Sequence, residues 1–163
     1  MDYLWAPWRI EYIRRDKSKN DECIFCRKAS EDDDKENLIV YRANKAFILL
    51  NLYPYNNGHL MVVPYRHTDD FTGLSEEESR EICQLTQLSV KVLESILKPQ
   101  GFNIGMNLGN VSGAGIADHI HQHIVPRWLG DTNFMPVTGN TKVMLHGLQE
   151  TWFELHKAFQ KLG

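Results

Sequence analysis

Three histidines stand at every second position in the stretch ADHIHQHIVPRW, residues 117–128. Alternate side chains of a β-strand share one face, so His119, His121 and His123 would line up at spacings of about 6–7 Å. Imidazole has an unperturbed pKa of about 6.5, so much of it is neutral near pH 7. A neutral imidazole can bind a metal ion or attack phosphorus. One such histidine is most often a satisfied polar residue, but three in register favour chemistry.

A Cys-x-x-Cys pair, Cys23 and Cys26, offers a second set of reactive groups. The spacing suits two thiolate ligands of a zinc ion, although two thiolates make only half a site. Buried structural cysteines are an alternative. A thioredoxin-like redox pair would need a helix that starts directly after a strand, and the surrounding sequence does not predict one. Three cysteines in total, with Cys83, do not describe a disulfide framework and indicate a reducing compartment.

The composition indicates a soluble globular protein of one domain. The chain has 163 residues, of which 42% are hydrophobic and 24% are charged. A net charge of -3 argues against nucleic acid as a partner, so a phosphate-bearing ligand would need a local pocket. No apolar run could span a bilayer, and the first residues do not resemble a secretion signal. We therefore expect a cytoplasmic protein without a membrane partner.

The elements that position these groups are expected to be strands with one long helix between them. Ser75 and Glu78 form a capping box, so a helix should begin there and end before Pro99 and Gly101. The order predicts an α+β domain, with a mostly antiparallel five-stranded sheet and helices on one side. Other expected elements are an aromatic N-terminal arm over 1–20, strands over 38–42, 46–51, 59–67, 102–109 and 119–125, a loop over 110–115, and a C-terminal helical segment over 142–163.

The histidine strand resembles the signature of a known family. HIHQHIV, residues 119–125, fits the His-φ-His-φ-His-φ-φ pattern of the histidine-triad (HIT) superfamily of nucleotide hydrolases and transferases, where φ is usually apolar. Gln122 departs from the pattern on the face away from the histidines. NLYPYNNGHLMVVPYRH, residues 51–67, resembles the family's Gly-His, apolar strand and Pro-x-x-His. LWAPWR (4–9) and PRWLGDTNFMP (126–136) resemble the branch that contains diadenosine tetraphosphate phosphorylase-like proteins.

The resemblance implies a single HIT-like domain over residues 1–163 and an enzyme that cleaves dinucleoside polyphosphates or nucleotide conjugates at the α-phosphate. His121 would be the nucleophile that becomes nucleotidylated, and water or phosphate would be the acceptor. His123 would contact the α-phosphate and assist the leaving group, with His119 completing the triad. A homodimer is expected, because the family is commonly dimeric.

The resemblance also implies a set of nucleotide-binding residues. Asn51 matches the position that binds the ribose hydroxyls. Asn107 and the backbone at Gly113 and Gly115 would hold phosphate, and His59 and Trp128 would lie in or beside the cleft. Three apolar residues fall where the family lines the base pocket, although they could equally be plain core: Phe47, Leu49 and Met61.

Some relatives in the superfamily pair Cys-x-x-Cys with the histidine of the Pro-x-x-His element and with the first histidine of the triad. Carried over to this chain, the ligands of one zinc ion per chain would be Cys23, Cys26, His67 and His119. Four protein ligands leave no position for water, so the zinc would be structural. It would anchor His119 and thereby orient the strand that carries His121.

Two other functions stay open on the sequence. The first is a non-catalytic nucleotide-binding module that keeps the fold, which would bind AMP but cleave no nucleotide. The second is a zinc-binding protein that uses the triad itself as a metal site, which would hold several ions per chain through His121 and His123.

Overall fold

The structure is a computed structural model that describes residues 22–139, 144 and 146–162. The predicted aromatic arm over 1–20, with its LWAPWR motif, lies outside these residues. The elements are α2 (Ile24–Ser30), β1 (Ile39–Arg42), β2 (Ala46–Leu50), β3 (Leu60–Pro64), α3 (Glu76–Leu97), β4 (Gly101–Met106), the 3₁₀ turn η1 (Asn110–Ser112), β5 (Gln122–Arg127), α4 (Met135–Thr138) and α5 (Leu148–Leu162). Among the described helices, none has the length and apolar character needed to cross a membrane.

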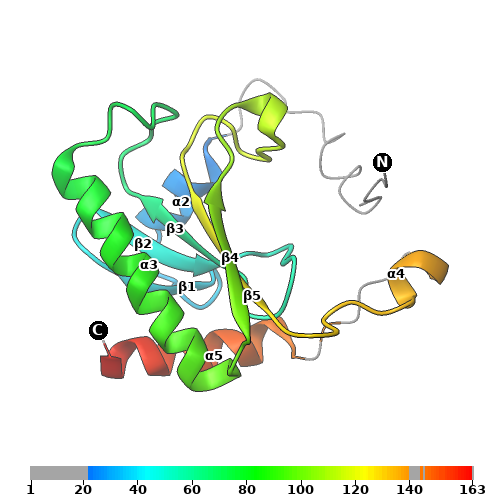
Figure 1. Cartoon of the computed structure of the whole chain (residues 1–163). Helices are drawn as coiled ribbons and strands as arrows, with labels where there is room; N and C mark the ends of the chain where they lie inside the picture. Colours follow the sequence, from blue (N-terminus) through cyan, green and yellow to red (C-terminus); the bar gives the residue numbers. More distant parts are fainter. Residues whose placement is uncertain (1–21, 140–143, 145, 163) are drawn as a thin grey trace.

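The five strands form one antiparallel sheet in the order β1-β2-β3-β5-β4 (Figure 1). β2 and β3 pair from Ala46 opposite Pro64 to Leu50 opposite Leu60. β5 runs between β3 and β4, so that His123 lies opposite Met61 on one side and Gly105 on the other. The predicted α+β class and the five-stranded antiparallel sheet are confirmed.

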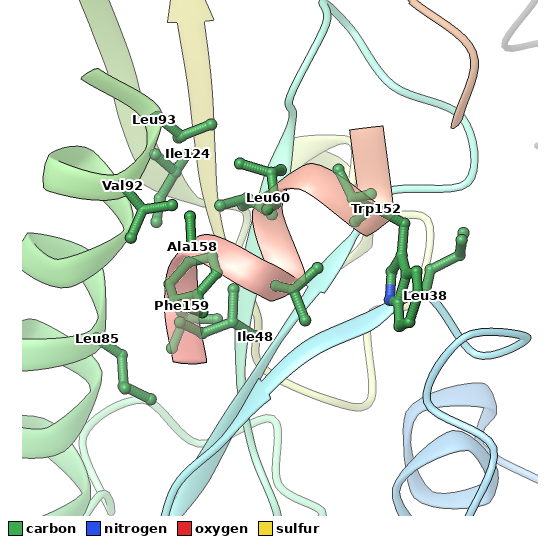
Figure 2. Close-up of a cluster of buried hydrophobic side chains, with 14 of the residues drawn as sticks. Leu38, Ile48, Leu60, Leu85, Val92, Leu93, Ile124, Trp152, Ala158 and Phe159 are labelled. Carbon is green, nitrogen blue, oxygen red and sulfur yellow. The ribbon is translucent and has the colours of Figure 1, made fainter. Parts of the chain in front are cut away.

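Alternating apolar residues cover both faces of the sheet. One set packs against α3 and α5 and forms the larger core (Figure 2), in which Ile48, Leu60 and Ile124 of the sheet meet helix residues such as Leu93 and Phe159. The other set packs against Phe25 of α2 and consists of Ile39, Phe47, Leu49, Met61 and Val63. The expectation of helices on one side only is therefore wrong. α2 has seven residues, too few turns for a periodic pattern to reveal it.

Helix α3 begins where the capping box predicts. The Ser75 hydroxyl accepts the Glu78 N–H, and the Glu78 carboxylate accepts the Ser75 N–H. The same carboxylate binds the guanidinium of Arg66 at 2.8 Å. These hydrogen bonds lower the pKa of the Glu78 carboxyl to about 2, and the hydrogen bond from Arg66 has the largest effect. The last residue of the helix is Leu97. Its C-cap, Lys98, has a left-handed φ of 47° and stands directly before Pro99.

Several predicted elements extend further than the observed ones. β3 ends at Pro64 and β4 at Met106, so His67 and Asn107 lie beyond the ends of their strands. The C-terminal helix begins at Leu148 rather than near 142. The Gly147 carbonyl accepts the Thr151 N–H as the first helical bond, and glycine is a poor helix interior residue. Trp152 docks the helix, since its indole N–H donates to the Ile39 carbonyl at 2.8 Å.

The cap predicts a stability change on substitution. Ser75→Ala should lower the free energy of unfolding by about 1 kcal/mol, because the Glu78 N–H loses its acceptor. Urea unfolding followed by circular dichroism measures this. Ser79→Ala, at an exposed site one turn further along α3, is the matched control and should cost nothing. Equal losses in the two variants would contradict the capping role.

Candidate functional site

The three histidines do not all lie on the paired strand. β5 starts at Gln122, so the prediction of a strand over 119–125 is wrong at its first residues. The Ile120 N–H donates to the Thr68 carbonyl at 2.8 Å, which takes this stretch out of the β3–β5 ladder. Side chains in this stretch still alternate between the two faces of the sheet. Gln122 points toward α3, where its amide donates to the Thr86 hydroxyl at 2.9 Å. The histidines face the other way, and His119 and His121 pack against Phe25 of α2.

Four potential metal ligands meet beside α2. The ligand atoms of Cys23, Cys26, His67 and His119 all lie within 4.8 Å of one another. The His119 Nδ1 is 3.3 Å from the Cys23 Sγ and 3.7 Å from the Cys26 Sγ, which in turn is 3.4 Å from the His67 Nδ1. Metal–sulfur bonds of about 2.3 Å and metal–nitrogen bonds of about 2.0 Å at a tetrahedral angle give S···N edges of about 3.6 Å. The cluster therefore fits a tetrahedral metal ion.

Local structure holds these ligands in place. Cys23 is the N-cap of α2, and Cys26 follows within its first turn. The Arg42 guanidinium secures the other end of α2 by donating to the carbonyls of Ala29 and Glu31 at 2.8 and 2.9 Å. The His119 Nε2 lies 2.8 Å from the Pro64 carbonyl oxygen. Because a carbonyl can only accept, the Nε2 carries the proton and the Nδ1 lone pair faces the thiols.

The charges of the cluster favour a bound cation. Burial raises the pKa of the Cys26 thiol to about 11, and the neighbouring Cys23 adds to the shift. Burial lowers the pKa of His119, which favours its neutral form. Neutral imidazoles and thiolates are the forms that bind metals, and a metal ion stabilises the thiolates that burial disfavours.

A hydrogen bond to the backbone determines which nitrogen of His121 keeps a lone pair. Its Nδ1 lies 2.9 Å from the His119 carbonyl oxygen, so the Nδ1 carries the proton and the Nε2 keeps a lone pair. Burial lowers the pKa of this imidazole, which is 5% exposed, and so favours the neutral form at pH 7. The Phe25 ring packs against His121 and His119, with ring centroids 5.1 and 5.4 Å away. His121 thus has the protonation state of a nitrogen nucleophile.

His123 lies next to His121, with ring centroids 4.8 Å apart and planes at 76°. Its Nδ1 is 2.9 Å from the Nε2 of His59, which is fully buried. Asn51 lies beside the same group, since its Nδ2 is 3.4 Å from the His59 Nδ1. The structure thus brings together the triad and two more residues that the sequence singled out.

The remaining predicted nucleotide-binding residues are more dispersed. Phe47, Leu49 and Met61 are at most 7% exposed and pack with Phe25 beneath α2, which favours the core alternative for them. The others lie where chain segments end or turn. Asn107 follows β4, Gly113 closes η1 with a φ of 87°, Gly115 precedes the triad, and the Trp128 N–H donates to the Asp131 carboxylate after β5.

Two residues of the site were not found from the sequence. Phe25 stands between the two cysteines of CIFC, so its place in the motif was an available signal. Tyr55 donates its backbone N–H to the His59 Nδ1 at 3.1 Å, and its ring lies 4.6 Å from that of His59. No sequence signal marks a backbone donor of this kind.

Comparisons with known proteins identify several relatives of this chain. An AP-4-A phosphorylase from Mycobacterium tuberculosis is 40% identical over 154 residues, which cover 91% of this chain and 79% of that protein. An adenosine 5'-monophosphoramidase from Schizosaccharomyces pombe is 30% identical over 105 residues, which cover 64% and 74% of the two chains. A zinc-bound histidine triad family protein from Mycobacterium smegmatis matches with a TM-score of 0.70 and 26% identity, over 86% of this chain and 95% of that one.

A match to a protein-family model shows to which family the chain belongs. The model of the HIT domain matches residues 32–128, which include β1 to β5 and all three triad histidines. This match covers more than half of the chain, and the sequence resemblance stated above is confirmed. The chain belongs to the HIT domain family.

Proposed function

We propose that this protein is a nucleotidyl hydrolase or transferase that works through a covalent nucleotide adduct on His121. The hydrogen bond from the His121 Nδ1 to the His119 carbonyl carries the proposal, because it leaves the Nε2 lone pair for attack. The Nε2 forms a bond to the α-phosphorus, and the bond from phosphorus to the leaving group breaks, its electron pair departing with that group. Water or phosphate then attacks the phosphoramidate and releases His121.

The substrate class is proposed from the relatives. One is named AP-4-A phosphorylase and another adenosine 5'-monophosphoramidase, and both names describe nucleotides linked through a 5'-phosphate. We therefore propose dinucleoside polyphosphates or nucleotide conjugates as substrates, cleaved at the α-phosphate. The phosphorylase name makes phosphate the first acceptor to test against water.

We also propose the contacts of the nucleotide. Asn51, half-buried beside His59, would bind the ribose hydroxyls. Asn107 and the backbone N–H groups at Gly113 and Gly115 would hold the phosphates, since successive backbone donors in a turn form an anion-binding concavity. Trp128 would border the same cleft. The homodimer, the cytoplasmic location and the absence of a nucleic-acid partner stay predictions.

The metal that we propose is one structural zinc ion per chain. Two thiols and two imidazoles at tetrahedral spacing are a donor set that zinc favours, and four protein ligands leave no open coordination position. The zinc-bound state of the Mycobacterium smegmatis relative supports this choice. Bound zinc would fix His119, whose carbonyl accepts the hydrogen bond of the His121 Nδ1–H. Among the described residues, the ligand cluster does not include His121 or His123, which weighs against metal storage by the triad.

The nucleophile is tested by substitution of His121. His121→Ala should lower kcat by about 10³-fold or more, because it removes the lone pair proposed to attack phosphorus. In the wild type, acid-labile radiolabelled nucleotide should be trapped on the protein, and in the variant it should not. Gln122→Leu is the matched control, since the neighbouring side chain faces α3, and it should still form the adduct. A wild-type kcat in His121→Ala would contradict the proposed nucleophile.

The acceptor is tested by product analysis with diadenosine tetraphosphate. With added phosphate, ADP plus ATP indicates phosphorolysis, and AMP plus ATP without it indicates asymmetric hydrolysis. We expect at least one of these product pairs. If the protein binds AMP but cleaves no member of a broad nucleotide panel, the non-catalytic binding module takes the place of the enzyme.

The zinc site is tested by metal content and stability. We expect one zinc per chain in the wild type and in Cys83→Ser, whose side chain is exposed on α3, but almost none in Cys23→Ser. Zinc at about 1,000 times its Kd should stabilise the wild type by about 4 kcal/mol, because the ion binds only the folded site. Thermal unfolding with and without chelator measures this. Several ions per chain that depend on His121 and His123 would contradict the structural role.

A further inference from the structure

We propose that Arg66 and Glu78 act as a positioning pair for the potential metal ligands, because they fix the turn that carries His67. This inference rests on the structural zinc site proposed above, and it gives a role to a charged pair that the nucleotide chemistry does not use. Glu78 has only 7% of its surface exposed. Its carboxylate accepts one hydrogen bond from the capping box and two from Arg66. The pair therefore does more than begin α3.

The ion pair holds the Arg66 side chain in one orientation. Its Nε and Nη2 donate to different oxygens of the Glu78 carboxylate, both at 2.8 Å. The same Nη2 donates to the Gly73 carbonyl at 2.9 Å. A planar guanidinium with two parallel hydrogen bonds has a fixed direction, which a lysine ammonium would not have. Arg66 therefore ties the turn after β3 to the first turn of α3 and to the loop between them.

Arg66 directly precedes one of the four potential metal ligands. Of these ligands, only His67 is exposed. It lies beyond the end of β3 at Pro64, so its place depends on the turn rather than on the sheet. Its Nδ1 is 3.4 Å from the Cys26 Sγ. Ligand distances in a metal site vary by only about 0.2 Å, so a small displacement of the turn would take this imidazole out of the tetrahedron.

The same turn supports the second histidine ligand, His119. The Pro64 carbonyl accepts the His119 Nε2–H, and the Thr68 carbonyl accepts the Ile120 N–H, both at 2.8 Å. These two acceptors stand on either side of Arg66 in the sequence. The four ligands thus have two supports: α2 carries the cysteines, and the turn that Arg66 fixes carries or contacts the histidines.

Substitutions can separate this positioning role from helix capping. Arg66→Met removes the guanidinium and leaves the cap intact. Glu78→Gln keeps a residue that suits a capping box, but its single amide oxygen cannot replace both carboxylate oxygens. Ser75→Ala does the reverse, since it weakens the cap and keeps the ion pair. Arg80→Met is the matched control, because it removes an exposed ion pair with Glu76 on the same helix.

The first measurement is the zinc affinity of the full-length protein, by competition with a chromogenic chelator. We expect Arg66→Met and Glu78→Gln to raise the zinc Kd by about tenfold, the lower end of the effect of changes behind metal ligands. Arg66→Lys, which keeps the charge without the planar fork, should recover part of the loss. Ser75→Ala and Arg80→Met should bind zinc as the wild type does.

The second measurement reads the geometry of the site rather than its stability. Cobalt in a tetrahedron of two thiolates and two imidazoles has intense ligand-field bands, which weaken when a ligand is lost and water enters. At saturating cobalt, Arg66→Met and Glu78→Gln should have weaker bands than the wild type, because the His67 imidazole is displaced. Circular dichroism of the same samples confirms that each variant is folded.

Three results would contradict the positioning role. One is a wild-type zinc Kd and cobalt spectrum in both Arg66→Met and Glu78→Gln. Another is an equal loss of zinc affinity in Ser75→Ala, since the effect would then follow helix stability rather than the turn. The third is a wild type that binds neither zinc nor cobalt, which would reject the metal site together with its positioning pair. The nucleotide adduct on His121 is measured separately and distinguishes these failures from a failure of the proposed transfer.

Discussion

The hydrogen bonds between the backbone and the imidazole rings decide which nitrogen of each histidine can react. The Pro64 carbonyl accepts the hydrogen bond of the His119 Nε2–H, and the Nδ1 lone pair faces the candidate metal ligands Cys23 and Cys26. Two residues later, the His119 carbonyl accepts the hydrogen bond of the His121 Nδ1–H, and the Nε2 keeps the lone pair that we propose attacks phosphorus. Two histidines of one motif thus expose opposite nitrogens. The period of a strand puts side chains on one face, but only these bonds give them separate tasks.

His119 connects the candidate metal ligands with His121, the proposed nucleophile. Its imidazole faces the two thiols, and its carbonyl orients His121. Phe25 adds a second connection, since it stands between the cysteines in the sequence and packs on both rings. The short helix α2 therefore does more than cover the sheet. By holding Cys23, Cys26 and Phe25 against His119 and His121, it links the candidate metal ligands to the position of the His121 ring.

The sequence predicted the parts of this arrangement that depend on local patterns. The capping box located the start of α3, and alternation correctly placed Gln122 on the opposite face from the histidines. Tertiary contacts decided the rest. β5 starts late because the Ile120 N–H pairs with Thr68 in a loop, and α2 is too short to show a period.

For individual side chains too, local patterns suggested some roles, whereas tertiary contacts decided the others. The Cys-x-x-Cys spacing suggested two metal ligands, and the family resemblance implied the other two, His67 and His119. The fold brings the ligand atoms of all four residues within 4.8 Å of one another. Phe47 and Leu49 could not be assigned to core or base pocket, because an apolar strand suits both. For His59, the Gly-His motif indicated a place near the cleft. The direction of its hydrogen bonds depends on the Tyr55 N–H, which no side-chain pattern reveals.

Neutron diffraction from deuterium-exchanged crystals tests the tautomers of the triad most directly, because it locates the exchanged hydrogen on each ring. The hydrogen bonds to backbone carbonyls predict a deuteron on the His121 Nδ1, none on its Nε2, and a deuteron on the His119 Nε2. A deuteron on the His121 Nε2 with a bare Nδ1 would contradict the account, since the attacking lone pair would then face the backbone.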